Sequence, residues 1–295
     1  VMSLRIVAVA AMDAAKLEAE VSQELGRVAP SRSLGSVDGL VALEWSLPGK
    51  SDEAARLRTH LGTRAIPADI AVLATGNARK RLLISDMDST IIGQECLDEL
   101  ADFAGLKAEV SAITERAMRG ELDFEGALTT RVGMLKGLGL DALEQAYSER
   151  ITLNPGAKTL VATMKASGAE TVLVSGGFTY FTSRVADAAG FQSHRGNTLI
   201  DDGKALTGEV GRPILGREAK LTALDEYAAA AGISREDVIA MGDGANDLAM
   251  IKASGLGIAY HAKPVVAAEA HAAIEHTDLR AALFFQGYEA KEFVG

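Results

Sequence analysis

The chain of 295 residues contains a single cysteine, Cys96. One thiol excludes an intrachain disulfide, and it is compatible with a reducing compartment. No apolar run approaches the roughly 18 residues that a helix needs to span a bilayer. The apolar stretch at residues 6–11 is too short to be the hydrophobic region of a signal peptide. We therefore expect a cytoplasmic protein that does not associate with membranes.

Basic residues are also scarce, because 30 Lys and Arg stand against 40 Asp and Glu, for a net charge of −10. This balance argues against broad binding to the phosphates of a nucleic acid. It does not exclude a small anionic substrate, since a local metal ion and a lysine can outweigh the field of the whole protein. The sequence has no internal repeat, and its length allows one large domain or two smaller ones.

The most informative stretch runs from Leu82 to Thr90. An apolar run ends abruptly in Asp86 and Asp88, and two hydroxyl residues follow. This pattern predicts a buried parallel strand with reactive groups at its carboxyl end, where open α/β sheets bind ligands. Two carboxylates so close together repel each other unless a cation lies between them or one of them is protonated. The alternative is an ordinary strand-to-turn junction.

Three further segments follow in order. Residues 171–177 form another apolar run, which ends in Ser-Gly-Gly. Lys220 follows a Gly-Arg-Glu-Ala turn and opens a predicted helix. Residues 238–247 form a third buried-strand pattern, which ends in Gly-Asp-Gly-Ala-Asn-Asp. Together the segments contain the groups that phosphoryl transfer needs: a carboxylate nucleophile, a hydroxyl, a cation and a metal-binding acid.

The motifs Asp-x-Asp-Ser-Thr, Ser-Gly-Gly, Lys and Gly-Asp-Gly-x-Asn-Asp resemble those of the haloacid dehalogenase-like phosphatases, and within them the phosphoserine phosphatases. The resemblance runs from about Leu82 to the C-terminus. It implies an α/β fold with a doubly wound parallel sheet and a helical cap inserted at about residues 93–151, where only helical periodicity is found. It also implies hydrolysis of O-phospho-L-serine through an aspartyl-phosphate, the last step of serine biosynthesis.

Residues 1–78 are predicted to form a separate small α/β unit, and residues 79–295 the phosphatase domain. In the first unit the pattern predicts strands at 4–10, 39–47 and 70–73 and helices at 13–25 and 51–61. Its order and size are similar to those of the ACT-type regulatory domain that phosphoserine phosphatases often carry. It lacks a Gly-rich ligand loop after its first strand. Such a unit could pair two chains into a homodimer. The polar residues 75–81 predict a linker.

The resemblance assigns the chemistry to a few residues. Asp86 would attack phosphorus, and Asp88 would protonate the leaving oxygen and later deprotonate water. Lys220 would offset charge on the transferred group. Mg²⁺ is the expected metal, because the available ligands are hard oxygens. It would be held by Asp86, the backbone carbonyl of Asp88, and Asp243. Asp247 would orient Lys220 or a metal-bound water.

The same resemblance predicts residues that bind the substrate. Ser175 and the Gly176 amide would donate to phosphate oxygens. Asn246 would hold phosphate or the motif loop, although capping of a helix is an equally good interpretation of that residue.

Selectivity for an amino-acid substrate would come from the inserted segment. Glu95 would bind the substrate ammonium group, and Arg131 would bind its carboxylate as a bidentate fork. Phe124 would close over the ligand.

Two alternatives remain open. The same residues would serve a phosphotransferase that passes the phosphoryl group from phosphoserine to another hydroxyl, such as that of homoserine. A different class is an amino-acid-sensing regulator that has kept a phosphatase-like fold without catalysis. The four intact groups Asp86, Asp88, Lys220 and Asp243 argue against the regulator, because a protein that only binds has no need of all four.

Overall fold

The structure is a computed structural model, and it describes residues 3–74, 78–118 and 121–295. The chain divides into two compact units. Residues 1–84, 155–171 and 224–295 form the first, and residues 85–154 and 172–223 form the second. The domain boundary predicted near residue 78 does not coincide with this division and stays a prediction. Part of the predicted linker, residues 75–77, lies outside the described residues.

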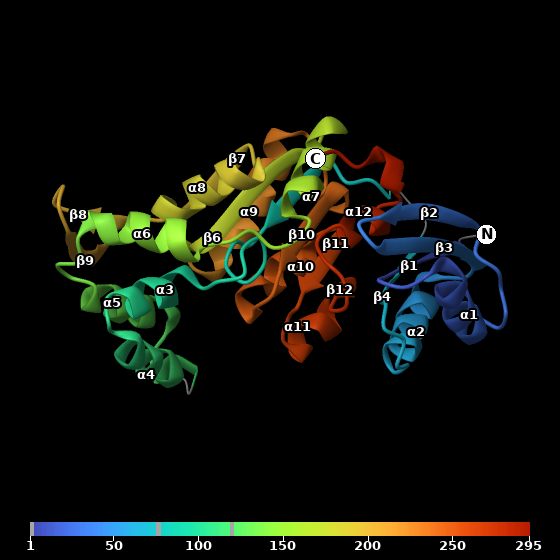
Figure 1. Cartoon of the computed structure of the whole chain (residues 1–295), viewed down its shortest axis with the longest axis horizontal. Helices are drawn as coiled ribbons and strands as arrows, with labels where there is room; N and C mark the ends of the chain where they lie inside the picture. The colour runs from blue at the N-terminus through green and yellow to red at the C-terminus, as the bar shows by residue number, and fades with distance from the viewer. Residues whose placement is uncertain (1–2, 75–77, 119–120) are drawn as a thin grey trace. The chain divides into compact units, whose positions relative to one another are not determined.

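An antiparallel sheet of four strands begins the first unit. Its strands are β1 (Ser3–Ala10), β2 (Arg32–Val37), β3 (Leu40–Pro48) and β4 (Asp69–Ala74), in the order β2-β3-β1-β4. Helices α1 (Ala14–Glu24) and α2 (Ser51–Gly62) cover the same face of this sheet (Figure 1). This chain order and strand order are those of a ferredoxin-like βαββαβ unit. The sequence pattern did not predict β2, because this edge strand is mostly exposed and lacks apolar alternation.

Both faces of β1 are buried. Ile6 and Ala8 pack with Leu17 of α1 and Trp45 of β3 in one apolar cluster. The Trp45 indole N–H donates to Ser22 Oγ at 3.1 Å, so this large side chain is buried without losing its hydrogen bond. The residues between these positions along β1 are buried as well, and helix α12 (Ala281–Phe285) of the same unit contacts this strand.

The N-terminal sheet is attached to residues 275–277 of the first unit through Asp69. Asp69 is only 3% exposed. It accepts hydrogen bonds from the backbone N–H groups of Glu275, His276 and Thr277 at 2.7–3.0 Å, and also from the Thr277 hydroxyl. Several charge-assisted hydrogen bonds on one buried carboxylate make this attachment strong.

A six-stranded sheet has the order β12-β11-β10-β5-β6-β7. Its strands are β5 (Leu82–Ser85), β6 (Glu170–Phe178), β7 (Ser193–Asn197), β10 (Val238–Gly242), β11 (Leu256–Tyr260) and β12 (Ala272–Ile274). The pairings β6–β7, β10–β11 and β11–β12 are parallel. Strand order reverses between β5 and β10, so three of the four motifs lie on neighbouring strands at a topological switch point. The predicted doubly wound core is confirmed.

The helices that accompany this sheet are α7 (Ala157–Ala166), α8 (Thr179–Ala189), α9 (Arg217–Ala230), α10 (Leu248–Ala253), α11 (Pro264–Glu269) and α12, with short 3₁₀ turns η1 (Arg235–Asp237), η2 (Ala245–Asp247) and η3 (Ala290–Glu292). Strands β8 (Leu199–Asp201) and β9 (Leu206–Val210) form an antiparallel hairpin. Helix α9 begins three residues before Lys220, so the prediction that Lys220 opens this helix was wrong. No helix among the described residues is both long and apolar enough to cross a membrane.

The inserted segment is helical, as the sequence predicted. It contains α3 (Cys96–Phe103), α4 (Lys107–Met118), α5 (Phe124–Met134) and α6 (Leu140–Arg150), drawn in green in Figure 1. The two chain segments that enter and leave it are joined by an isolated bridge between Ile92 and Leu153. Gln94 and Thr152 add two hydrogen bonds beside this bridge, at 2.8 and 2.9 Å. The insertion therefore begins and ends at the same place, where its two connecting segments are paired.

Candidate active site

Asp86 follows β5 directly and is almost completely buried. The residue is 5% exposed, and Lys220, at 3%, is buried equally well. The Lys220 ammonium lies 2.8 Å from Asp86 Oδ1, and the Met87 N–H donates to the same oxygen at 2.8 Å. Two donors on one oxygen stabilise the ionised carboxylate. The buried Asp86 carboxylate is thus paired with an ammonium group and a backbone N–H group, both of which favour its ionised form.

Asp88 has a different environment. Burial, together with the nearby charge of Glu95, raises the pKa of Asp88 to about 7. The Cys96 N–H donates to Asp88 Oδ1 at 3.4 Å, which opposes this rise. A carboxyl group with a pKa near 7 exchanges protons readily at neutral pH. The two carboxyl groups of the motif therefore have different environments, as an acid and a nucleophile must.

Cys96 itself is a buried free thiol. Burial raises the pKa of this thiol far above its usual range, and the charge of Asp88 adds to the effect. The thiolate is the nucleophilic form of cysteine. Cys96 therefore stays protonated and does not act as a nucleophile.

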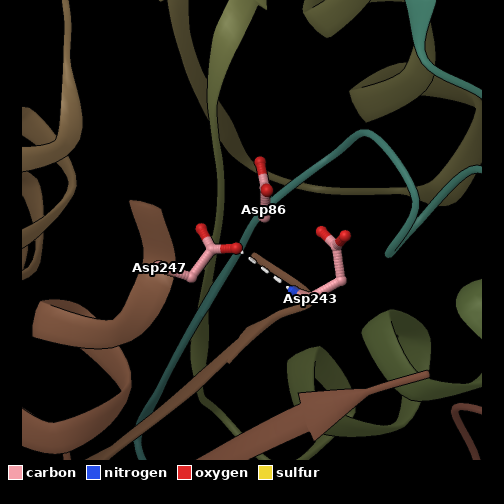
Figure 2. A group of neighbouring side chains, drawn as sticks. All are labelled: Asp86, Asp243 and Asp247. Carbon is pink, nitrogen blue, oxygen red and sulfur yellow. Dashed lines mark hydrogen bonds between the residues drawn. The ribbon is translucent and has the colours of Figure 1, made fainter. Parts of the chain in front are cut away.

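Three carboxylates gather at the carboxyl ends of β5 and β10. One oxygen each from Asp86, Asp243 and Asp247 lies within 4.8 Å of the others (Figure 2). Asp247 Oδ2 accepts the backbone N–H groups of Asp243 and Gly244, at 3.1 and 3.0 Å, and so holds this loop. Gly242 is required here, because an added Cβ would come within 2.3 Å of the Asp247 carboxyl carbon.

Asn246 lies in the same loop, in the turn η2. Its side-chain oxygen lies over Gly244, where an added Cβ would come within 2.3 Å. The residue that caps helix α10 is Asp247, and the one that caps η2 is Gly244. The interpretation of Asn246 as a helix cap was therefore wrong.

The Ser-Gly-Gly motif forms a bulge in β6. Pairing with β7 joins Val174 to Arg195 and resumes with Phe178 and Asn197, so residues 175–177 stand opposite one residue of β7. Within the bulge, Ser175 is buried and its Oγ accepts the Gly177 N–H at 2.8 Å. The serine hydroxyl keeps its own proton for another acceptor. An added Cβ at Gly177 would come within 3.1 Å of Asp88 Oδ2, so this bulge lies beside the acid.

Glu95 precedes helix α3. The Ser89 hydroxyl donates to Glu95 Oε1 at 2.7 Å. Ser89 has φ of +55°, in the left-handed region that few residues other than glycine adopt. Shielding from water raises the pKa of Glu95, and the Ser89 hydrogen bond opposes this rise. The strained turn at Ser89 thus orients the Glu95 carboxylate.

Arg131 and Phe124 are both on helix α5. Burial lowers the pKa of Arg131, while the charges of Asp98 and Glu95 act in the opposite direction. The predicted pair of Glu95 and Arg131 is therefore close enough to interact electrostatically. Phe124, at the first turn, is 43% exposed, and an added Cβ at Gly176 would lie 3.4 Å from its ring. The inserted helices thus bring an exposed aromatic ring against the Ser-Gly-Gly motif.

Asn197 was not predicted from the sequence. It ends β7, is 2% exposed, and donates through Nδ2 to the Gly176 carbonyl oxygen at 2.8 Å. No motif or periodicity indicated this residue, because a single asparagine before a hairpin is an ordinary turn residue.

This geometry can perform group transfer at phosphorus. It combines a buried anionic carboxylate, a neighbouring acid with a pKa near neutrality, a buried ammonium group and a serine hydroxyl. Acyl-phosphate chemistry requires a carboxylate nucleophile and charge stabilisation of this kind.

The comparisons with known proteins agree with this chemistry. Residues 83–252 match the model of the haloacid dehalogenase-like hydrolases. A phosphoserine phosphatase of Streptomyces coelicolor is 42% identical over 258 residues, which are 86% of this chain and 62% of that relative. The chain thus spans less than two thirds of the length of that protein.

Solved structures resemble the chain as well. A probable phosphoserine phosphatase from Vibrio cholerae has a TM-score of 0.81 and 31% identity, and the match covers 98% of this chain and 88% of that one. A substrate-bound phosphoserine phosphatase has a TM-score of 0.65 and 39% identity, over 70% of this chain and 98% of that one. The match to the hydrolase model covers more than half of the residues, and it includes the strands and loops that carry Asp86, Ser175, Lys220 and Asp243. The chain belongs to the haloacid dehalogenase-like hydrolases.

Proposed function

We propose that this protein hydrolyses O-phospho-L-serine to L-serine and phosphate through an aspartyl-phosphate on Asp86. The observation that carries the proposal is the contrast between two carboxyl groups two residues apart. Asp86 pairs with the Lys220 ammonium at 2.8 Å, whereas burial and the charge of Glu95 raise the pKa of Asp88 to about 7. Relatives named phosphoserine phosphatase support the choice of substrate.

The residues act in two steps. Asp86 attacks phosphorus, an oxygen–phosphorus bond forms, and the bond from phosphorus to the serine oxygen breaks as Asp88 donates its proton to that oxygen. Asp88 then accepts a proton from water, which attacks phosphorus and releases phosphate from Asp86. Lys220, the Ser175 hydroxyl and the Gly176 amide stabilise charge on the transferred group.

We also propose that the site holds Mg²⁺. The donor set fits this ion, because the three grouped side chains offer only carboxylate oxygens within 4.8 Å of one another. Asp86 and Asp243 would hold the ion together with the Asp88 carbonyl, and Asp247 would support the loop. When bound, Mg²⁺ would supply positive charge that offsets repulsion among the carboxylates and the phosphate.

A phosphate-release screen over small phosphomonoesters tests both proposals. We expect phosphoserine to be the best substrate, and we expect activity to disappear after exhaustive chelation and return with Mg²⁺. Excess Ca²⁺ should inhibit, because Ca²⁺ prefers more ligands and looser geometry than Mg²⁺. Full activity without a divalent metal would contradict the metal proposal. Addition of homoserine to the same assay measures any transfer of phosphate to a second hydroxyl.

Glu95 and Arg131 are proposed to contact only the amino-acid part of the substrate. Glu95→Gln and Arg131→Ala should raise KM for phosphoserine about 10- to 100-fold, because a hydrogen bond to a charged group contributes about 1.5–3 kcal/mol. An aryl phosphate, which has neither amine nor carboxylate, should be hydrolysed at an unchanged rate. Arg116→Ala is the matched control, since Arg116 is an exposed arginine of α4 paired with Glu121 at 3.1 Å. Equal losses on both substrates would assign these residues to the chemistry or to the fold.

Residues 79–295 are proposed to retain catalysis without the N-terminal sheet, since all residues with a proposed role lie beyond residue 78. An inactive but folded fragment would show that the catalytic part depends on residues 1–78.

The attachment at Asp69 predicts a cost in stability. In the full chain, Asp69→Ala should lower the free energy of unfolding by about 1.5–3 kcal/mol, because charge-assisted hydrogen bonds from backbone N–H groups to a buried carboxylate are lost. Denaturant unfolding measures this loss, and kcat should not change.

A homodimer through the N-terminal sheet, ACT-type ligand binding there and a cytoplasmic location stay predictions. Light scattering on the full chain and on residues 79–295 tests the first of these. If the full chain is a monomer, the dimer prediction fails. Serine inhibition that is identical in the full chain and in the fragment would assign inhibition to the Glu95–Arg131 site and exclude sensing by residues 1–78.

A further inference from the structure

The bulge in β6 creates a problem of hydrogen bonding that one side chain solves. Residues 175–177 leave the regular ladder with β7, because they stand opposite a single residue of that strand. A bulge leaves backbone groups without their ladder partners. The Gly176 carbonyl oxygen finds its partner in the side chain of Asn197, whose Nδ2 donates to it at 2.8 Å.

The other hydrogen-bonding groups of the Asn197 amide bind a second loop. Nδ2 also donates to the Leu215 carbonyl oxygen at 3.1 Å, and Oδ1 accepts the Leu215 N–H at 2.7 Å. The side-chain amide thus pairs with both backbone groups of one residue, as a neighbouring strand would. The Leu215 N–H requires an acceptor, so the oxygen and nitrogen of the amide cannot exchange places.

Leu215 stands just before helix α9, which begins at Arg217 and carries Lys220 in its first turn. The Gly176 loop and the Lys220 helix are far apart in sequence, yet both are held by one planar group. Both parts face the phosphoryl group in the proposed mechanism. Asn197 is 2% exposed, and these three hydrogen bonds join its side chain to backbone atoms, so its influence on the reaction passes through them.

The neighbouring residue shows how closely the strands approach at this point. An added Cβ at Gly196 would meet the Gly177 carbonyl oxygen at 3.1 Å and the Thr179 nitrogen at 3.2 Å. These distances are tighter than ordinary van der Waals contact. The bulge therefore lies in close contact with β7, and Asn197 of that strand bonds to its Gly176 carbonyl oxygen.

We propose that Asn197 is a positioning residue. Its side chain joins the Ser175–Gly177 bulge to the loop that precedes Lys220, and so fixes the positions of the groups that bind the phosphoryl group in the proposed mechanism. The proposal rests on the proposed phosphatase function. A change at Asn197 should alter contacts with the phosphoryl group and leave contacts with the serine part unchanged.

The test uses the full chain with Mg²⁺ and the variant Asn197→Asp, which keeps the shape of the side chain and removes both N–H donors. We expect kcat to fall about 10- to 100-fold on phosphoserine and on an aryl phosphate alike, because displacement of catalytic groups by about 1 Å costs a factor of this size. The inhibition constant of inorganic phosphate should rise about tenfold, while that of L-serine should stay within about twofold.

Thr182→Val is the matched control. Thr182 is a buried residue of α8, the helix that contacts β7, and its hydroxyl contacts His194 on β7 at 2.9 Å. Among the described residues, that hydroxyl bonds to neither of the two loops held by Asn197. This variant should keep kcat and both inhibition constants within about twofold, even where its melting temperature falls as far as that of Asn197→Asp.

Three results would overturn the proposal. They are an unchanged kcat in Asn197→Asp, a parallel loss of phosphate and serine affinity, and an equal loss of kcat in Thr182→Val. If Asn197→Asp does not fold, Asn197→Ser is judged by the same criteria. If the wild-type chain hydrolyses the aryl phosphate but not phosphoserine, the proposed substrate fails, while the role of Asn197 is still decided by the aryl phosphate and by calorimetric binding of inorganic phosphate.

Discussion

Asp86→Asn should lower kcat by roughly 10⁴- to 10⁶-fold, because the amide cannot form the acyl-phosphate and loss of a nucleophile removes most of the catalysis. The structure adds a reason for the size of this effect. Asp86 Oδ1 accepts hydrogen bonds from the Lys220 ammonium and from the Met87 N–H. The substitution therefore also places a neutral amide beside two donors that favour a carboxylate. Phosphate release from phosphoserine at saturating substrate measures kcat.

The control for this variant is Asp225→Asn. It removes an exposed carboxylate that pairs with Arg235 at 2.7 Å, on the outside of helix α9. We expect its kcat to equal that of the wild type. Mass spectrometry of the quenched wild-type reaction should find a phosphoryl group on Asp86 and none in Asp86→Asn. A near-native rate for Asp86→Asn would exclude the covalent mechanism.

Asp88→Asn is expected to have the second-largest effect, a loss of roughly 10²- to 10⁴-fold in kcat, which is the usual contribution of a general acid or base. The pKa of about 7 is the basis of this prediction, since it lets one carboxyl group donate and then accept a proton at neutral pH. An asparagine can do neither.

The leaving group separates this role from a structural one. An aryl phosphate has a good leaving group that needs little protonation, so Asp88→Asn should still form the phospho-enzyme from it. Hydrolysis of the intermediate should then be slow, and phosphorylated protein should accumulate after a burst of released phenol. Equal impairment of both steps with an aryl phosphate would mean that Asp88 supports the fold of the site instead.

The sequence was sufficient to predict the parts of the fold that depend on local patterns. Apolar runs before Asp86, Ser175 and Asp243 predicted strands, and glycines such as Gly190, at φ of +93°, marked where helices end. The order of the motifs identified the family, because phosphoryl transfer requires a carboxylate nucleophile, a hydroxyl, a cation and a metal-binding acid, and the motifs contain all four groups. Edge strand β2 was missed, since a strand with little buried surface has little apolar alternation.

Only the tertiary structure decided how these groups act on one another. The pKa of Asp88 depends on its burial and on Glu95, which no spacing rule reports. Asp247 proved to hold the Asp243 loop through backbone N–H groups. Asn197 joins two loops that are about 40 residues apart in sequence, and its partners are backbone atoms that every residue possesses. A local pattern in the sequence can show which side chains are available, but hydrogen bonds to the backbone and the exclusion of water arise only when distant segments pack together.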